Sequence, residues 1–265
     1  MPPLIIVSAS RAPTEARVAR ADVAAAAATA LAVVGWNNVV AAQDWHHRHY
    51  VLGNLTSAAA LLAVARLRGV RAHELGLSPQ RAAAGARLGA VLSGMVMVGF
   101  AAVASSPNHR RWLRDERVAR MSNRSVAYHA AVRVPLGTVV WEETAFRAVL
   151  PVLLRRVLPG LRARLANSVL FGLWHVRPTL DALRVNGVAV AGLGASSAVL
   201  GAVVAGALVD VLLSGLQRTT GSLLAPALVH IAANSSGTVA AALASRQAAR
   251  RTPGEQRVGC IGGRG

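Results

Sequence analysis

Two adjacent carboxylates and a guanidinium lie inside an otherwise apolar stretch of this chain. The stretch runs from Val134 to Leu154 and contains Glu142, Glu143 and Arg147. A charge at the centre of a membrane helix costs about 2.5–3.5 kcal/mol to insert, so such residues usually face the protein interior and have a function. In a helix, Glu143 and Arg147 lie on one face and can pair, whereas Glu142 points about 100° away. The spacing predicts one neutralised carboxylate and one that is free for chemistry.

Two later apolar stretches also carry polar or aromatic residues four positions apart. These are Phe171 and His175 in one stretch, and His230 and Asn234 in the other. Singly, such a histidine is more often a packing residue, and such an asparagine commonly joins two helices. Together with a carboxylate, they suit peptide hydrolysis, in which one group activates water, another transfers protons, and donors stabilise the oxyanion.

The composition excludes several other chemistries. The 29 basic residues are all arginine, so a P-loop lysine, a Schiff-base lysine and a Ser–Lys dyad are ruled out. The His-Glu-x-x-His zinc motif is also absent, because Leu77 stands where His73-Glu74 would need its second histidine.

The hydropathy of the chain is that of an all-α, polytopic membrane protein. Of its 265 residues, 54% are hydrophobic, the mean hydropathy is +0.44, and several apolar runs are long enough to span a bilayer. We expect about seven transmembrane helices, or eight at most, with the site inside the bundle. The predicted spans are Ala21–Ala41, Val51–Val64, Leu88–Ser105, Val134–Leu154, Leu165–Val176, Val188–Leu216 and Ser222–Ala244.

The same pattern divides the chain into four parts. Residues 1–20 are expected to be a flexible N-terminal segment, and residues 21–133 to hold the first helices and basic loops. The polar residues above fall in a predicted core at 134–244. The Arg/Gly-rich tail at 245–265 is expected to be disordered.

The net charge of +18 indicates partners at the membrane surface. The arginines lie between the apolar runs, which favours anionic lipids over nucleic acid. The lysine-free composition, rich in Ala, Val, Gly and Arg, is typical of a GC-rich bacterial coding sequence and points to a bacterial inner (plasma) membrane. Asp210, near the end of its span, could line the cavity, but we expect it at the membrane interface or paired with Arg218.

The three motifs, taken in order, resemble one family. Glu142-Glu143-x-x-x-Arg147, Phe171-x-x-x-His175 and His230-x-x-x-Asn234 are similar to the motifs of the CPBP family, the CAAX proteases and bacteriocin-processing enzymes. This family includes the Rce1-like CAAX endopeptidases. The resemblance covers roughly residues 135–237.

The resemblance implies a membrane-embedded endopeptidase and a role for each site residue. Glu142 would be the general base that activates water, with His175 sharing the proton. His230 and Asn234 would stabilise the oxyanion, while Glu143 and Arg147 would shape the site. We expect no cofactor; the alternative is a zinc ion bound by Glu142, His175 and His230. The expected substrate is a membrane-associated peptide or protein.

Two other functions are compatible with buried polar residues. One is a non-proteolytic membrane scaffold or immunity factor on the same fold. The other is a transporter that uses the acid and the histidines as a proton relay. Presence of all six polar residues favours the enzyme over the scaffold, and the chain shows no inverted repeat that would support the transporter.

Overall fold

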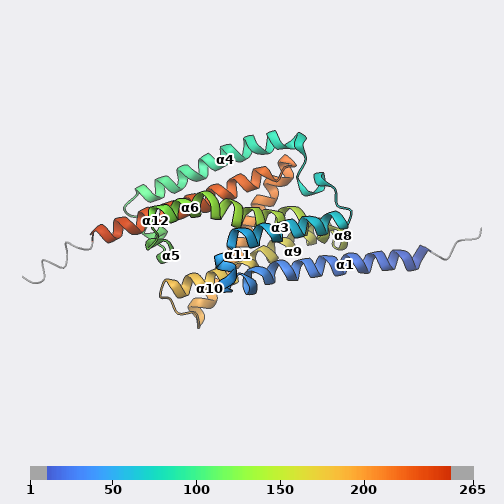
Figure 1. Cartoon of the computed structure of the whole chain (residues 1–265), viewed down its shortest axis with the longest axis horizontal. Helices are drawn as coiled ribbons and strands as arrows, with labels where there is room; N and C mark the ends of the chain where they lie inside the picture. The colour runs from blue at the N-terminus through green and yellow to red at the C-terminus, as the bar shows by residue number, and fades with distance from the viewer. Residues whose placement is uncertain (1–10, 252–265) are drawn as a thin grey trace, which may run out of the picture.

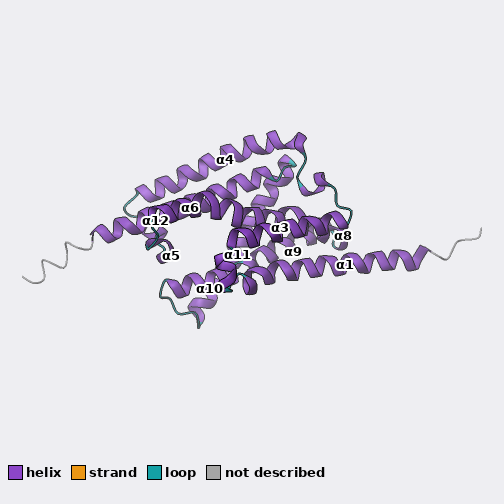
Figure 2. Ribbon diagram, in the orientation of Figure 1, coloured by secondary structure: helices purple, strands orange, loops and turns teal. Residues whose placement is uncertain are grey.

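Apolar segments in a bilayer must satisfy their backbone N–H and C=O groups internally, and a helix does so within a single segment. The computed structural model describes residues 11–251, and within that range the chain forms helices and no strands (Figures 1 and 2). Its α-helices are α1 (Arg11–Gly35), α2 (Asp44–Arg48), α3 (Tyr50–Leu67), α4 (Pro79–Ser105), α5 (Glu116–Ala119), α6 (Asn123–Tyr128), α7 (Val140–Glu143), α8 (Leu150–Val157), α9 (Gly160–Trp174), α10 (Val176–Val185), α11 (Leu193–Thr220) and α12 (Leu224–Arg251).

Other helix types occur between them. Three segments are π-helical, which means that each N–H bonds to the carbonyl five residues earlier rather than four. They are η1 (Trp36–Val40), η4 (His129–Val139) and η5 (Thr144–Val149). Two short 3₁₀ turns are η2 (Ala72–Leu75) and η3 (Arg110–Leu113). Because α6, η4, α7, η5 and α8 follow each other without a break, residues 123–157 form one continuous helical segment, the site helix.

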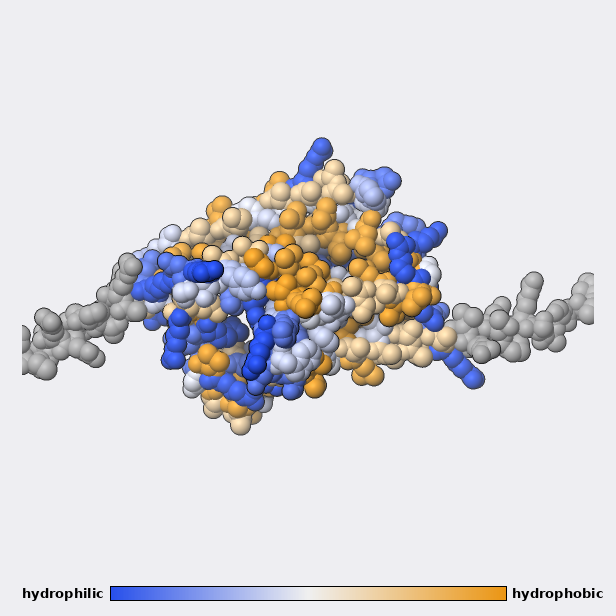
Figure 3. Space-filling view, in the orientation of Figure 1, coloured by the Kyte–Doolittle hydropathy of each residue, from blue (hydrophilic) through white to orange (hydrophobic). Residues whose placement is uncertain are grey.

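The described residues include five helices that are long and apolar enough to cross a membrane. They are Ala19–Val40, Tyr50–Leu67, Pro79–Ser105, Leu193–Thr220 and Leu224–Ala248. Apolar side chains cover the middle of the molecule and polar ones gather toward its ends (Figure 3). The fold is therefore all-α and polytopic, and the protein is an integral membrane protein. The site helix and α9 lie among these helices; whether they complete seven spans stays a prediction.

Consecutive long helices run in opposite directions. The α3–α4, α8–α9 and α11–α12 connections lie at the end of the bundle where α1 begins (Figure 1). α4 packs along α12, α9 along α11, and α1 along α8. These contacts place the site helix between α3, α9 and α12.

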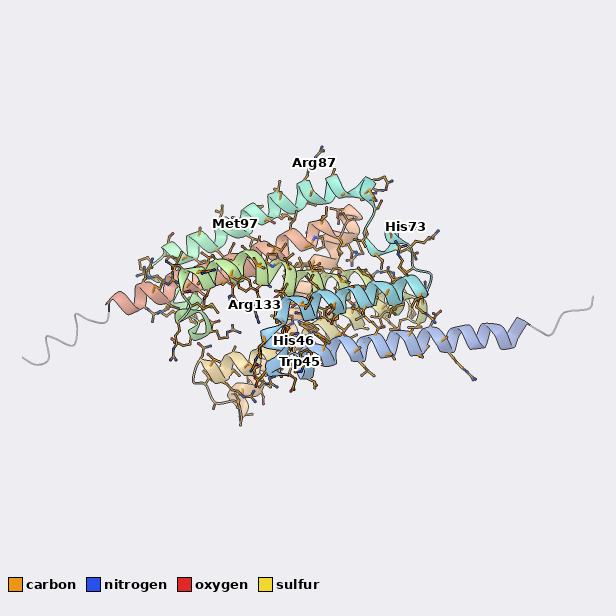
Figure 4. All side chains as sticks on the ribbon, in the orientation of Figure 1. Trp45, His46, His73, Arg87, Met97 and Arg133 are labelled. Atoms are coloured by element: carbon orange, nitrogen blue, oxygen red, sulfur yellow. The ribbon has the colours of Figure 1, made fainter. Side chains whose placement is uncertain are left out.

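Several helices extend past the apolar runs from which their bounds were predicted. α1 begins at Arg11 rather than Ala21, so the segment 1–20 is helical from residue 11. α4 begins at Pro79, ahead of the predicted Leu88, and includes Arg87, which points away from the bundle (Figure 4). An apolar run ends at its first arginine, but the helix can continue because a long arginine side chain reaches water.

Two interior boundaries also differ from the prediction. The segment 107–133, preferred as a basic loop over an amphipathic helix, is helical from Asn123, where the Ser122 side chain caps the helix by accepting a hydrogen bond from the Ser125 N–H. The division at residues 133 and 134 therefore falls inside one continuous helix. Residues 188–192 precede α11, which begins after Gly192 at φ +88°. A positive φ is a conformation that glycine adopts readily and other residues rarely do.

The C-terminal tail is helical at its start, because α12 continues to Arg251. The rest of that predicted disordered tail, 252–265, and residues 1–10 of the predicted flexible segment lie outside the described residues.

Candidate active site

Two prolines lie in the site helix on either side of the glutamates. Proline has no N–H, and in a π-helix each N–H bonds to the carbonyl five residues earlier. Pro135, inside η4, therefore leaves the carbonyl of Ala130 without a π-helical partner, and Pro151 lies in the first turn of α8. Ser235 of α12 donates to the Ala130 oxygen at 2.7 Å, and Asn167 of α9 donates to the Phe146 oxygen at 3.0 Å. Side chains from two neighbouring helices thus hold the site helix above and below the glutamates.

The two glutamates occupy a single short α-helical turn. That turn, α7, lies between the π-helical segments η4 and η5, and residues 141–150 are all buried. π-helical turns are found frequently at functional sites. The change between π-helix and α-helix therefore occurs at the same two glutamates whose charges make them functional candidates in the sequence.

His230 lies between the two carboxylates. Its Nδ1 is 2.8 Å from Oε1 of Glu143, a hydrogen bond in which the imidazole N–H donates to the carboxylate. Its Nε2 faces Oε2 of Glu142 at 3.6 Å, which is longer than a hydrogen bond. All three side chains are at most 8% exposed. α12 thus brings to the glutamates an imidazole whose Nδ1 is held and whose Nε2 remains available.

Glu142 has a partner of its own, which the sequence did not predict. The indole Nε1 of Trp174 donates to Oε1 of Glu142 at 3.1 Å. The carboxylate expected to be free for chemistry therefore accepts a hydrogen bond from a neutral donor. The contact could not be foreseen from spacing, because Trp174 comes from α9 and lies 32 residues along the chain.

The predicted pair of Glu143 and Arg147 is present, with 3.4 Å between Oε1 and Nη1. Arg147 is 1% exposed and also lies 3.5 Å from Oδ1 of Asp210 on α11. Its guanidinium carbon sits 4.2 Å from the centre of the Phe171 ring, a cation–π contact. One guanidinium therefore lies between two buried carboxylates and against an aromatic face.

Asp210 is the main functional-site candidate that sequence reasoning misplaced. It is 1% exposed and accepts hydrogen bonds from Ser168 Oγ at 2.7 Å and from Asn167 Nδ2 at 3.1 Å. Its partner is Arg147, so its expected position at the membrane interface or beside Arg218 is corrected. The signal was available, since an acid in an apolar span is itself unusual, but its partner lies on another helix.

His175 ends α9 at the edge of this cluster. Its Nδ1 is bonded to the Phe171 carbonyl oxygen at 2.8 Å, and its ring packs on the Phe171 ring. Gly172 allows α9 to touch α11 here, because a Cβ at this position would lie 2.4 Å from the Val203 carbonyl oxygen. In the part of the chain that the structure describes, no hydrogen bond or ion pair joins His175 to Glu142.

Asn234 lies one turn beyond His230 and is exposed. Its side chain has no hydrogen bond to any of residues 11–251, although its backbone carbonyl accepts one from Thr238. The structure therefore gathers Glu142, Glu143, Arg147 and His230 in one buried cluster and places His175 and Asn234 beside it.

A second polar network fixes the site helix from the opposite side. Asn54 of α3 donates to the Gly137 carbonyl at 2.9 Å, and its Oδ1 accepts from Trp36 Nε1 at 2.9 Å. The same oxygen is 3.0 Å from Nε2 of His46, which must therefore be the donor. Burial lowers the pKa of His46, so its imidazole is neutral near neutral pH.

The network continues into an aromatic cluster around Tyr50. The guanidinium of Arg133 lies 3.7 Å from the centre of the Tyr50 ring, and Tyr50 bonds to Thr138 at 2.9 Å. Figure 4 shows Arg133 directed into the space between the site helix and the region of His46 and Trp45. Figure 3 shows the surface hollowed at this place. These residues carry no recognisable motif, and sequence reasoning did not identify them.

The three residues of the alternative zinc site are not assembled as a ligand set. Nδ1 of His175 is engaged by a backbone carbonyl, and only His230 approaches Glu142. Among residues 11–251, no group of three or more His, Cys, Asp or Glu side chains is placed to hold a metal ion. We therefore derive no step through a metal.

Comparison with known proteins places this site in a family. No curated protein and no solved structure matches the chain. Residues 125–236 match the family model described as type II CAAX prenyl endopeptidase Rce1-like, and all six predicted site residues lie within the match. This family is one of membrane CAAX-protease-type endopeptidases. The segment that builds the buried cluster is therefore similar to the Rce1-like members of the CPBP family.

Proposed function

We propose that the protein hydrolyses a peptide bond near the membrane surface with a water molecule activated by Glu142. The observation that carries this proposal is the buried pair of glutamates with His230 between them. Two carboxylates and an imidazole in a site screened from water are the groups that general acid–base catalysis uses. The Rce1-like family supports the reaction class, and the geometry supports the assignment of roles.

In the proposed reaction, Glu142 accepts a proton from water while the water oxygen bonds to the substrate carbonyl carbon. The carbonyl oxygen becomes an oxyanion, which donors must stabilise. When the intermediate collapses, the C–N bond breaks and Glu142 returns the proton to the leaving amine. Trp174 fixes the orientation of the Glu142 carboxylate through its N–H, so one carboxylate oxygen remains for the water.

His230 is the imidazole that this geometry places in the reaction. Glu143 holds its Nδ1–H and stabilises a positive charge on the ring, so a protonated Nε2 can donate to the oxyanion. Asn234, one turn away, supplies a second donor from an amide with no other partner in the described chain. Proton sharing between Glu142 and His175 would need His175 to move, and we assign His175 to the edge of the site.

The substrate we propose is a membrane-associated peptide or protein, and the location a bacterial plasma membrane. The test is hydrolysis of internally quenched fluorescent peptides by purified protein in detergent micelles. We expect cleavage that persists in excess strong chelator, because water activation rests on Glu142. Activity that chelator removes and zinc alone restores would replace this mechanism with Lewis-acid activation. No cleavage of any peptide by correctly folded protein would instead favour the non-proteolytic scaffold.

Asn234→Ala separates a catalytic amide from one that joins helices. An oxyanion donor acts mainly in the transition state, so we expect kcat to fall by about 10²–10³-fold with a nearly unchanged KM. Because the side chain is exposed and has no partner in the described chain, the melting temperature should stay within a degree or two of wild type. Steady-state kinetics and thermal unfolding on the same preparation measure both. Wild-type kcat in the variant would remove Asn234 from the catalytic set.

A further inference from the structure

A pocket between α8, α9 and α11 lies next to the buried cluster but takes no part in the proposed reaction. It has a volume of about 200 Å³. Asp210, Asn167 and Ser168 line its inner part, and Arg155, Arg164 and Arg218 line it closer to solvent. Its lining residues lie on both sides of the α8–α9 connection and in the last part of α11.

Three guanidinium groups converge on this pocket without a carboxylate between them. None of Arg155, Arg164 and Arg218 forms an ion pair within the described part of the chain. Arg155 is attracted by Glu74 of η2, with which it forms no ion pair, and is repelled by Arg218. Asp210 cannot neutralise them, because it is already bonded to Ser168 and Asn167 and faces Arg147. The outer part of the pocket therefore has a positive charge that an anion would balance.

The inner part of the pocket offers an acceptor instead. Asn167 is 2% exposed, and its Nδ2 donates both to the Phe146 carbonyl and to Asp210. These acceptors fix which end of the amide is nitrogen, so the remaining atom is Oδ1. Oδ1 is buried and has no hydrogen-bond partner, an arrangement that costs about 1–3 kcal/mol unless a donor fills it. A hydroxyl group meets this need.

The surroundings of the pocket favour a lipid over a soluble anion. Leu161, Leu165 and Val211 line it and are themselves between 47% and 60% exposed. In a membrane protein such exposed apolar side chains contact acyl chains. We propose that this pocket binds the headgroup of an anionic glycerophospholipid, with its phosphate on the three arginines and a headgroup hydroxyl on Asn167. Phosphatidylglycerol has both groups.

The experiment is a lipid titration of the purified full-length protein in mild detergent, followed by its thermal unfolding. We expect a saturable rise in melting temperature with phosphatidylglycerol and none with phosphatidylcholine. Each arginine–phosphate contact removed should weaken apparent binding about tenfold. The Arg164→Gln/Arg218→Gln variant should therefore bind phosphatidylglycerol about a hundredfold more weakly. These side chains are exposed, so the variant should fold, which circular dichroism checks.

Arg162→Gln is the matched control, because Arg162 is exposed on the same helix but does not line the pocket. Its titration should equal that of wild type. Phosphatidic acid, which has the phosphate without the glycerol hydroxyl, should bind more weakly than phosphatidylglycerol if Asn167 accepts a hydrogen bond.

Three results would overturn the proposal. Unchanged phosphatidylglycerol binding by the double variant would do so. An equal loss of binding in Arg162→Gln would also do so, because the lipid would then be responding to the general surface charge. A full stabilisation by glycerol phosphate or inorganic phosphate alone would retain a phosphate site but reject the lipid as its occupant. Because the readout is binding, failure here would leave the proposed peptidase reaction untouched.

Discussion

Glu142→Gln is expected to lower the rate of peptide hydrolysis by about 10²–10⁴-fold, the range that a general base contributes. The amide keeps the shape of the side chain and can still accept the Trp174 hydrogen bond at its oxygen, but it cannot take a proton from water. The helix and its packing should therefore persist. Single-turnover kinetics with the fluorescent peptide measure the loss, and the melting temperature reports the fold.

The control for this prediction is Glu74→Gln. Glu74 lies in η2, where its carboxylate accepts hydrogen bonds from the Arg71 backbone and side chain and takes no part in the buried cluster, so turnover should be that of wild type. A Glu142→Gln protein that retains wild-type turnover would reject Glu142 as the base and with it the proposed mechanism.

Glu143→Gln is expected to act first on stability. Glu143 faces both Arg147 and the Nδ1–H of His230, and removing one partner of a buried ion pair costs about 3–5 kcal/mol. Asp210 remains beside Arg147, so the loss should fall toward the lower end of this range. Turnover should also fall, because His230 loses the group that orients it. Thermal unfolding and yield, compared with Glu142→Gln, measure the difference.

Asp181→Asn is the control for this stability comparison, because it removes the acid of two surface ion pairs. Asp181 forms ion pairs with Arg177 and Arg184, all on α10 and partly exposed, and such surface pairs contribute at most about 1 kcal/mol. Its melting temperature should stay near that of wild type. If Glu142→Gln proves less stable than Glu143→Gln, the structural and catalytic roles of the two glutamates are exchanged.

The sequence by itself determined that the protein is an all-α membrane protein and which side chains share one face of a helix. Apolar runs of bilayer length leave the backbone no alternative to helices, which gave the all-α membrane fold. Spacing within one helix was equally reliable: Glu143 and Arg147 are four residues apart and do pair, at 3.4 Å. Both results depend on local geometry, which a helix repeats whatever surrounds it.

Only the tertiary structure decided which helix faces meet. Trp174 reaches Glu142, Asp210 reaches Arg147, and His230 reaches both glutamates, each from a different helix. Periodicity could not predict these contacts, because helices apolar on nearly every side do not show which face is turned inward. That choice is made where backbones can approach, as at Gly172 against Val203. It is made also where a carbonyl left without its helical partner by a proline accepts a hydrogen bond from a neighbouring helix, as Ala130 does from Ser235. In a membrane protein, close packing and the satisfaction of buried polar groups orient the helices, and both depend on the whole bundle.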